Sequence, residues 1–258
     1  MSFDIVIKDG FIFDGSGAPR VRGDVGIAEG RVVAIGRVDH RDAAQVIDGN
    51  GMHIAPGFVD LHTHYDAQIF WDPYCTLSGW HGITSVAIGN CGFGFAPVAP
   101  EMREYAMRSM VRVEAIPYDS MAQGMPWDWV TFPEFLDSVD RTPKGLNILP
   151  YVPIAPMMVW VMGRDEAKTG RMPTDAELLA QRKGLSEALT AAQQQAALGA
   201  PGSRAVFEAT SQAVTAFDKP HPGVRAKAAE AAVGGGFWRT FQWTKNLLPS
   251  SNQSVDRF

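Results

Sequence analysis

Two histidines, His62 and His64, stand at alternate positions after a short run of strand-forming residues, Phe58–Leu61. Side chains two apart in an extended strand point to the same face, so both imidazoles can reach one point. Imidazole nitrogen is a common ligand of first-row metal ions. A single histidine here would more often be a polar residue near a strand end. Two in register, flanked by Asp60 and Asp66, favour a metal site.

Asp66 has two candidate roles at this site. A metal-bound histidine usually donates its second ring N–H to an acceptor, and the Asp66 carboxylate could be that acceptor. It could instead contact a substrate. A carboxylate that is simply solvated in a loop is the third interpretation of this residue.

Two longer stretches resemble a known family. Pro56–His64, with the sequence PGFVDLHTH, resembles the signature of the amidohydrolase superfamily, metal-dependent hydrolases whose first barrel strand ends in His-x-His. Gly89–Pro97, with the sequence GNCGFGFAP, is similar to the D-aminoacylase (N-acyl-D-amino-acid deacylase) branch, in which a cysteine at the end of the second strand is a zinc ligand. The resemblance covers about residues 4–190. It implies that Cys91 joins the two histidines at a zinc ion.

Cys91 suits that role because a thiolate is a strong zinc donor, and coordination keeps it deprotonated at neutral pH. It lies 27 residues after His64. This is close to the roughly 31 residues per strand–helix unit expected when about 250 residues form eight units. Asn90, in the same motif, is expected to contact the substrate or to support the ligands. Tyr151, after the third expected strand, either lines the substrate pocket or packs against its neighbours.

The elements that must position these residues change in character near residue 56. Before it, short strands are expected with turns at residues 8–10 and 29–30, where Asp-Gly and Glu-Gly separate β-branched runs. After it, strands and helices alternate, which is typical of parallel α/β architecture. Strands are expected at 58–62, 84–89 and 146–152. Helices are expected at 72–80, 100–113, 131–139 and from a capping box at Thr174 and Glu177, with a loop-rich insert at 117–129.

The resemblance implies an α/β fold, an amidohydrolase-type TIM-like (β/α) barrel with a small N-terminal β-sandwich segment. Residues 1–55 are expected to form part of the sandwich and residues 56–210 the front half of the barrel. Residues 204–210 could add a fourth strand. About four of eight strands can be found, so residues 211–258 are interpreted as a divergent, truncated or frame-shifted tail.

Composition excludes several classes of partner. A net charge of −5, with no run of basic residues longer than a pair, argues against binding to nucleic acid or to an anionic membrane. No apolar run approaches the length needed to span a bilayer. Two cysteines in a chain this long fit a reducing compartment, so a cytoplasmic protein is expected.

The function implied by the resemblance is zinc-dependent hydrolysis of a non-peptide C–N amide bond in a small molecule, such as an N-acyl (D-)amino acid or a related amide. The superfamily also uses a proton-transferring aspartate and two further histidine ligands, and none of these can be placed. We therefore expect an incomplete and weakly active copy of the enzyme. Because its barrel strands are unpaired, it could form a homo-oligomer. The alternative is a non-catalytic zinc-binding or subunit-interaction fragment.

Overall fold

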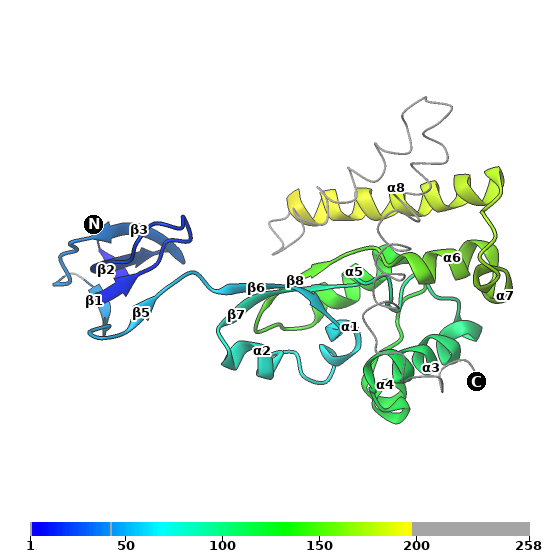
Figure 1. The fold of residues 1–258 in the computed structure, drawn as a ribbon, viewed down its shortest axis with the longest axis horizontal. Coiled ribbons are helices and arrows are strands. Elements are labelled where there is room, and N and C mark those ends of the chain that lie inside the picture. Colours follow the sequence, from blue (N-terminus) through cyan, green and yellow to red (C-terminus); the bar gives the residue numbers. More distant parts are fainter. Residues whose placement is uncertain (1, 42, 198–258) are drawn as a thin grey trace. The chain divides into compact units, whose positions relative to one another are not determined.

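The structure, a computed structural model, describes residues 2–41 and 43–197. They fall into two compact units, Met1–Phe58 and a second unit that begins at Val59 (Figure 1). Among the described helices, none is both long enough and apolar enough to cross a lipid bilayer. The expected strand at 204–210 and the expected tail at 211–258 lie outside the described residues.

The first unit is a mixed five-stranded sheet in the order β3-β2-β1-β4, with β5 paired to β1. Its strands are β1 (Phe3–Ile12), β2 (Val21–Ala28), β3 (Arg31–Gly36), β4 (Ala43–Asp48) and β5 (His53–Ile54). β1 is antiparallel to β2 and parallel to β4 and β5. The turn expected at residues 29–30 is confirmed, because β2 and β3 pair antiparallel on either side of it and both residues have positive φ.

The turn expected at residues 8–10 is wrong, because β1 continues through it. Asp9 has a φ of 62°, and the pairing with β2 changes register between Ile7 and Gly10. The backbone N–H of Asp9 donates to Asp24 Oδ1 at 2.8 Å. The Asp-Gly signal therefore marks a β-bulge, which bends a continuous strand instead of reversing the chain.

The second unit contains a three-stranded sheet in the order β6-β7-β8 (Figure 1). Its strands are β6 (Phe58–Thr63), β7 (Ile83–Ile88) and β8 (Asn147–Pro150). β7 and β8 are parallel, with Ile88 opposite Pro150. All three expected strands are present, with ends that differ by one or two residues from those expected.

Helices connect and follow these strands in the second unit. They are α1 (Tyr65–Gln68), α2 (Thr76–Trp80), the 3₁₀ turn η1 (Pro100–Met102), α3 (Arg103–Glu114), α4 (Tyr118–Gly124), α5 (Phe132–Arg141), α6 (Ile154–Met162), α7 (Arg164–Lys168) and α8 (Asp175–Ala197). The helices expected at 72–80, 100–113, 131–139 and after Thr174 are confirmed. Thr174 and Glu177 form the expected capping box, with reciprocal hydrogen bonds of 2.7 and 3.3 Å.

The loop-rich insert expected at residues 117–129 is wrong in part. It contains the two-turn helix α4, and the side chains of Met121, Met125 and Trp129 are buried in the core. A helix this short, enclosed by prolines, shows no clear hydrophobic period. α6 was not expected either, because its sequence is apolar on nearly every side and carries no periodic signal.

Trp129 lies at the centre of the second unit's core and is 1% exposed. Its ring stacks on Phe70 with centroids 5.3 Å apart and meets the edge of Phe135 at 5.1 Å. Its indole Nε1–H donates to the carbonyl oxygen of Phe95 at 2.8 Å. The core thereby holds the segment that follows Cys91.

Candidate metal centre

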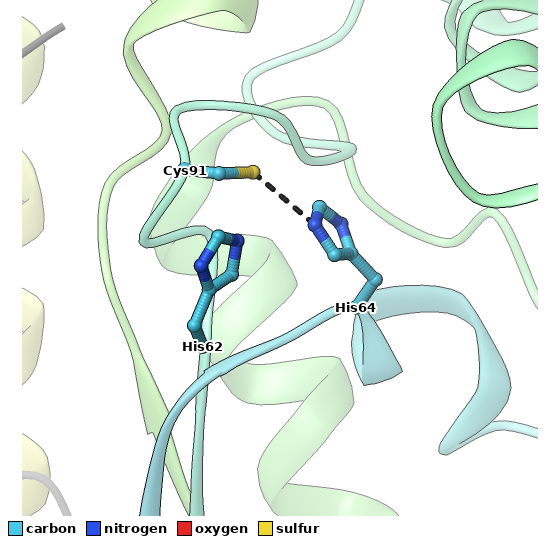
Figure 2. Close-up of side chains that lie close together, drawn as sticks. All are labelled: His62, His64 and Cys91. Carbon is cyan, nitrogen blue, oxygen red and sulfur yellow. Dashed lines mark hydrogen bonds between the residues drawn. The ribbon is translucent and has the colours of Figure 1, made fainter. Parts of the chain in front are cut away.

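His62, His64 and Cys91 meet where β6 and β7 end (Figure 2). His62 is the second-last residue of β6, His64 is the N-cap of α1, and Cys91 follows β7. One potential ligand atom from each lies within 4.8 Å of the others. Cys91 Sγ is 3.3 Å from His64 Nε2, and the two imidazole centroids are 5.5 Å apart. The structure therefore brings together the three residues predicted to bind a metal.

Glycines give the backbone the shape that presents Cys91. Gly89 and Gly92 have φ values of 75° and 94°, a region that side chains other than glycine rarely adopt. A Cβ atom on Gly89 would lie 2.6 Å from the carbonyl oxygen of Tyr151, so β7 and β8 could not approach as they do. These steric limits explain the glycines on either side of the cysteine.

Asn90 ties the cysteine loop to the histidine strand. Its side-chain Nδ2 donates to the carbonyl oxygen of Leu61 at 2.6 Å, directly before His62. On the other side, the N–H of Ala155 donates to the carbonyl of Gly92 at 2.9 Å. Asn90 therefore supports the end of β6, and a contact with substrate stays a prediction.

Burial shifts the protonation equilibria of both the cysteine and the histidine. Burial raises the pKa of the Cys91 thiol to about 11, and the nearby carboxylates of Asp66 and Glu114 act in the same direction. Burial also lowers the pKa of His64, which favours the neutral imidazole that a metal requires. A nearby metal ion reverses the first effect, since it stabilises the thiolate.

Asp66 is buried, at 2% exposure, so its interpretation as a solvated loop carboxylate is wrong. Among the described residues, neither of its carboxylate oxygens has a hydrogen-bond partner, and neither does His64 Nδ1. Burial raises the pKa of Asp66 to about 7. Buried polar groups without partners are costly, and a cation beside them offsets that cost. With two imidazoles and a thiol as donors, the residues present fit zinc.

Glu114 reaches the same site and was not predicted from the sequence. It is the last residue of α3, and its Oε1 lies 3.1 Å from His64 Nε2. It lies far from both metal motifs along the chain, and no spacing rule connects it to them. One signal could have found it, because the helix dipole disfavours an acid at a helix C-terminus. Such a residue needs a compensating partner.

Tyr151 directly follows β8 and is 39% exposed. Its backbone N–H donates to the carbonyl of Ile88 at 2.9 Å, which extends the pairing of β7 and β8. The residue thus lies just beyond the end of β8, the strand next to the one that precedes Cys91. Whether its ring lines a substrate pocket or only packs stays open as a prediction.

Comparison with known proteins first indicates the class of protein that this chain resembles. Residues 45–149 match the Amidohydrolase family. N-acyl-D-aspartate deacylase of Alcaligenes xylosoxydans xylosoxydans is 35% identical over 188 residues, which are 73% of this chain and 35% of that protein. D-aminoacylase of the same organism is 30% identical over 209 residues, which are 80% of this chain and 40% of that protein.

A solved structure agrees with these relatives. N-acyl-D-glutamate deacylase of Bordetella bronchiseptica, complexed with zinc and a phosphonate inhibitor, matches with a TM-score of 0.60 at 29% identity. The match covers 74% of this chain and 37% of the deacylase. The resemblance to the amidohydrolases is therefore confirmed over the N-terminal part of the chain. Within them, the homologues are D-aminoacylases and N-acyl-D-amino-acid deacylases, and the chain spans 35 to 40% of their length.

Proposed function

We propose that this chain forms the metal-binding part of a zinc-dependent hydrolase that cleaves a non-peptide C–N amide bond. The proposed substrate class is N-acyl amino acids, with the D-series first. The observation that carries the proposal is the convergence of His62, His64 and Cys91 within 4.8 Å. The names of three relatives, an N-acyl-D-aspartate deacylase, a D-aminoacylase and an N-acyl-D-glutamate deacylase, support the substrate class.

Each ligand has a defined part in this chemistry. Zinc, when bound, supplies a Lewis acid and makes a water-derived nucleophile available near neutral pH. His62 and His64 would hold the ion through neutral nitrogen, and Cys91 would contribute one negative charge. Three protein donors would leave room for water or substrate at the ion. Asp66 places a buried carboxylate two residues beyond His64, where it can support the ligand or contact the substrate.

The same proposal extends to the fold around the site. We infer that β6, β7 and β8 open a TIM-like (β/α) barrel, with residues 1–55 as part of a β-sandwich and the barrel continuing to about residue 210. The parallel pairing of β7 and β8 and the TM-score of 0.60 to a deacylase support this inference. A cytoplasmic location and a homo-oligomeric state stay predictions.

The test is an amide-hydrolysis assay on the purified chain with N-acetyl-D-aspartate, N-acetyl-D-glutamate and N-acetyl-D-methionine, each beside its L-enantiomer. We expect release of the free D-amino acid that depends on zinc and is lost in His62→Ala. Residual hydrolysis that is insensitive to chelator and to this substitution would contradict the proposal. Tight zinc binding without hydrolysis of any of these amides would favour the non-catalytic zinc-binding fragment.

A further inference from the structure

A cavity of about 370 Å³ lies between α3 and α6 in the second unit. Residues from the segment 93–99, which begins two residues after Cys91, form part of its lining. α3 contributes Ala106 and Met110, and α6 contributes Val159 and Trp160. The volume falls within the range of about 300 to 1,000 Å³ that is usual for small-molecule pockets.

The cavity borders the candidate metal centre. Gly94 lines the cavity, and a Cβ atom on this residue would lie 4.0 Å from Asp66 Oδ2. Asp66 follows His64 by two residues. α3 lines the cavity with Met110 and ends at Glu114, whose Oε1 lies 3.1 Å from His64 Nε2. The same loop and the same helix therefore border both the cavity and the three predicted ligands.

The lining of the cavity suits an uncharged group. The Ser109 hydroxyl already donates to the carbonyl oxygen of Tyr105 at 2.9 Å. Among the described residues that line the cavity, Glu101 and Arg164 are charged, and both are exposed. The guanidinium of Arg164 lies 5.3 Å from the centre of the Tyr105 ring. The charges thus lie at the outer rim, and a charged group carried further in would lose its water without gaining a partner.

An N-acyl amino acid has one half that meets this requirement. The amino-acid half carries a charged α-carboxylate close to the amide nitrogen. The acyl half is an uncharged chain attached to the carbonyl carbon. With the amide at the metal centre, the acyl chain can enter the cavity while the carboxylate stays outside it, where it keeps its water.

We propose that this cavity binds the acyl chain of the substrate, and that this chain is apolar and longer than acetyl. The inference rests on the proposed function and names the acyl group of that substrate. η1 and α3 line the cavity from Met102 to Met110, a length of about 12 Å at the helical rise of about 1.5 Å per residue. An extended chain advances about 1.2 Å per bond, so the cavity has room for about eight to ten carbons.

The experiment titrates the full-length chain by calorimetry with N-acyl-D-alanines that carry acetyl, butanoyl, hexanoyl, octanoyl or dodecanoyl groups. Each titration is made on metal-free protein and repeated with zinc. A second series keeps the acetyl group and changes the amino acid to D-leucine and D-phenylalanine.

Two variants fill the cavity, Ala106→Phe from α3 and Val159→Phe from α6. Val111→Phe is the matched control, because Val111 lies on α3, is exposed and does not line the cavity. Circular dichroism checks that each variant is folded.

We expect the association constant of the parent chain to rise about fourfold for each added methylene, in metal-free and in zinc-loaded protein alike. The rise should level off beyond about ten carbons. Ala106→Phe and Val159→Phe should lose the rise, and Val111→Phe should keep it. The series with different amino acids should show no comparable rise.

Equal affinity of the parent chain for the acetyl and octanoyl compounds would overturn the inference. A rise that follows the amino-acid side chain, or one that both cavity-filling variants retain, would do the same. A dimeric parent chain that binds none of the amides and becomes monomeric in Ala106→Phe would show that a second copy covers the cavity, which also overturns the inference. Zinc content and hydrolysis are measured on the same preparations. A chain that keeps the dependence on acyl length but neither holds zinc nor hydrolyses these amides would support the acyl site and contradict the proposed function.

Discussion

Cys91 is the one anionic donor in the predicted ligand set, so its removal should have the clearest effect. We expect Cys91→Ser to lower both bound zinc and the melting temperature, because a ligand that binds only the folded state stabilises it. The size is about 2.7 kcal/mol when free zinc is a hundred times its dissociation constant. Elemental analysis and calorimetry measure the two effects. Cys75→Ala, which removes the other thiol, should keep its zinc. A Cys91 variant that loses zinc without any change in melting temperature would contradict this expectation.

Gly89 allows the close approach of β7 and β8 below the cysteine. We expect Gly89→Ala to destabilise the protein by about 1 to 3 kcal/mol, because it places a Cβ in a left-handed conformation. That atom would also lie 2.6 Å from the carbonyl oxygen of Tyr151. Urea unfolding measures the loss. Gly79→Ala is the control, since a Cβ there meets only atoms at 3.8 Å or beyond. Equal stability of the two variants would show that the strands adjust freely.

Local spacing made part of the site predictable. His62 and His64 follow from strand alternation, and Cys91 from a motif at a distance that suits consecutive strand ends. Glu114 could not be predicted, because its contact with His64 depends on how α3 packs and not on any short spacing. The burial of Asp66 was also hidden, since an acid after a strand is more often solvated.

At the scale of elements, strands and long capped helices were predictable, and short or uniformly apolar helices were not. α5 and α8 carry capping boxes in their sequences. α4 is too short and α6 too apolar for a helical period to show. The bulge at Asp9 shares its Asp-Gly signal with a hairpin turn. Only the pairing of β1 with β2 distinguishes the two.

Trp129 connects the core to the loop that follows Cys91. We expect Trp129→Phe to cost about 1 to 3 kcal/mol, because it leaves the buried carbonyl of Phe95 without its donor. Zinc affinity should fall with it, since the loop beyond Cys91 loses an anchor. Chemical unfolding and chelator competition measure both. Trp80→Phe, at an exposed position, should change neither. A Trp129 variant with lower stability but full zinc affinity would show that zinc binding does not depend on this part of the core.

The start of α8 gives the chain a defined response to acid. Hydrogen bonds from Arg171, and then from the Thr174 backbone, lower the pKa of Glu177 from 4.5 to about 2. A depressed pKa means that the carboxylate stabilises the fold above about pH 4.5 and loses that effect as the pH falls toward 2. The melting temperature of the parent chain should therefore exceed that of Glu177→Gln at neutral pH, and the difference should shrink below pH 4.5. Glu187→Gln, later on α8, is the control. A difference that stays constant down to pH 2 would contradict this assignment.

At the scale of the whole molecule, spectroscopic signals should follow the unfolding of the two units separately. The described tryptophans all lie after Phe58, so their fluorescence follows the unit that begins at Val59. The predicted zinc ligands lie in that unit as well. We expect zinc to raise the midpoint of the fluorescence transition, while the part of the circular dichroism transition that belongs to the β-rich first unit stays unchanged. A single transition that moves as a whole in both signals would show that the two units unfold together.

The contact between His64 and Cys91 joins residues 27 positions apart, with α1, α2 and β7 between them. An ion bound to both would act as a reversible cross-link that closes this segment into a ring. By analogy with a disulfide, a ring of that size removes about 3 to 4 kcal/mol of chain entropy from any partly unfolded state that keeps the ion. Loss of the metal would then be slow and tied to opening of the ring, and protease cleavage between residues 65 and 90 would abolish retention of the ion.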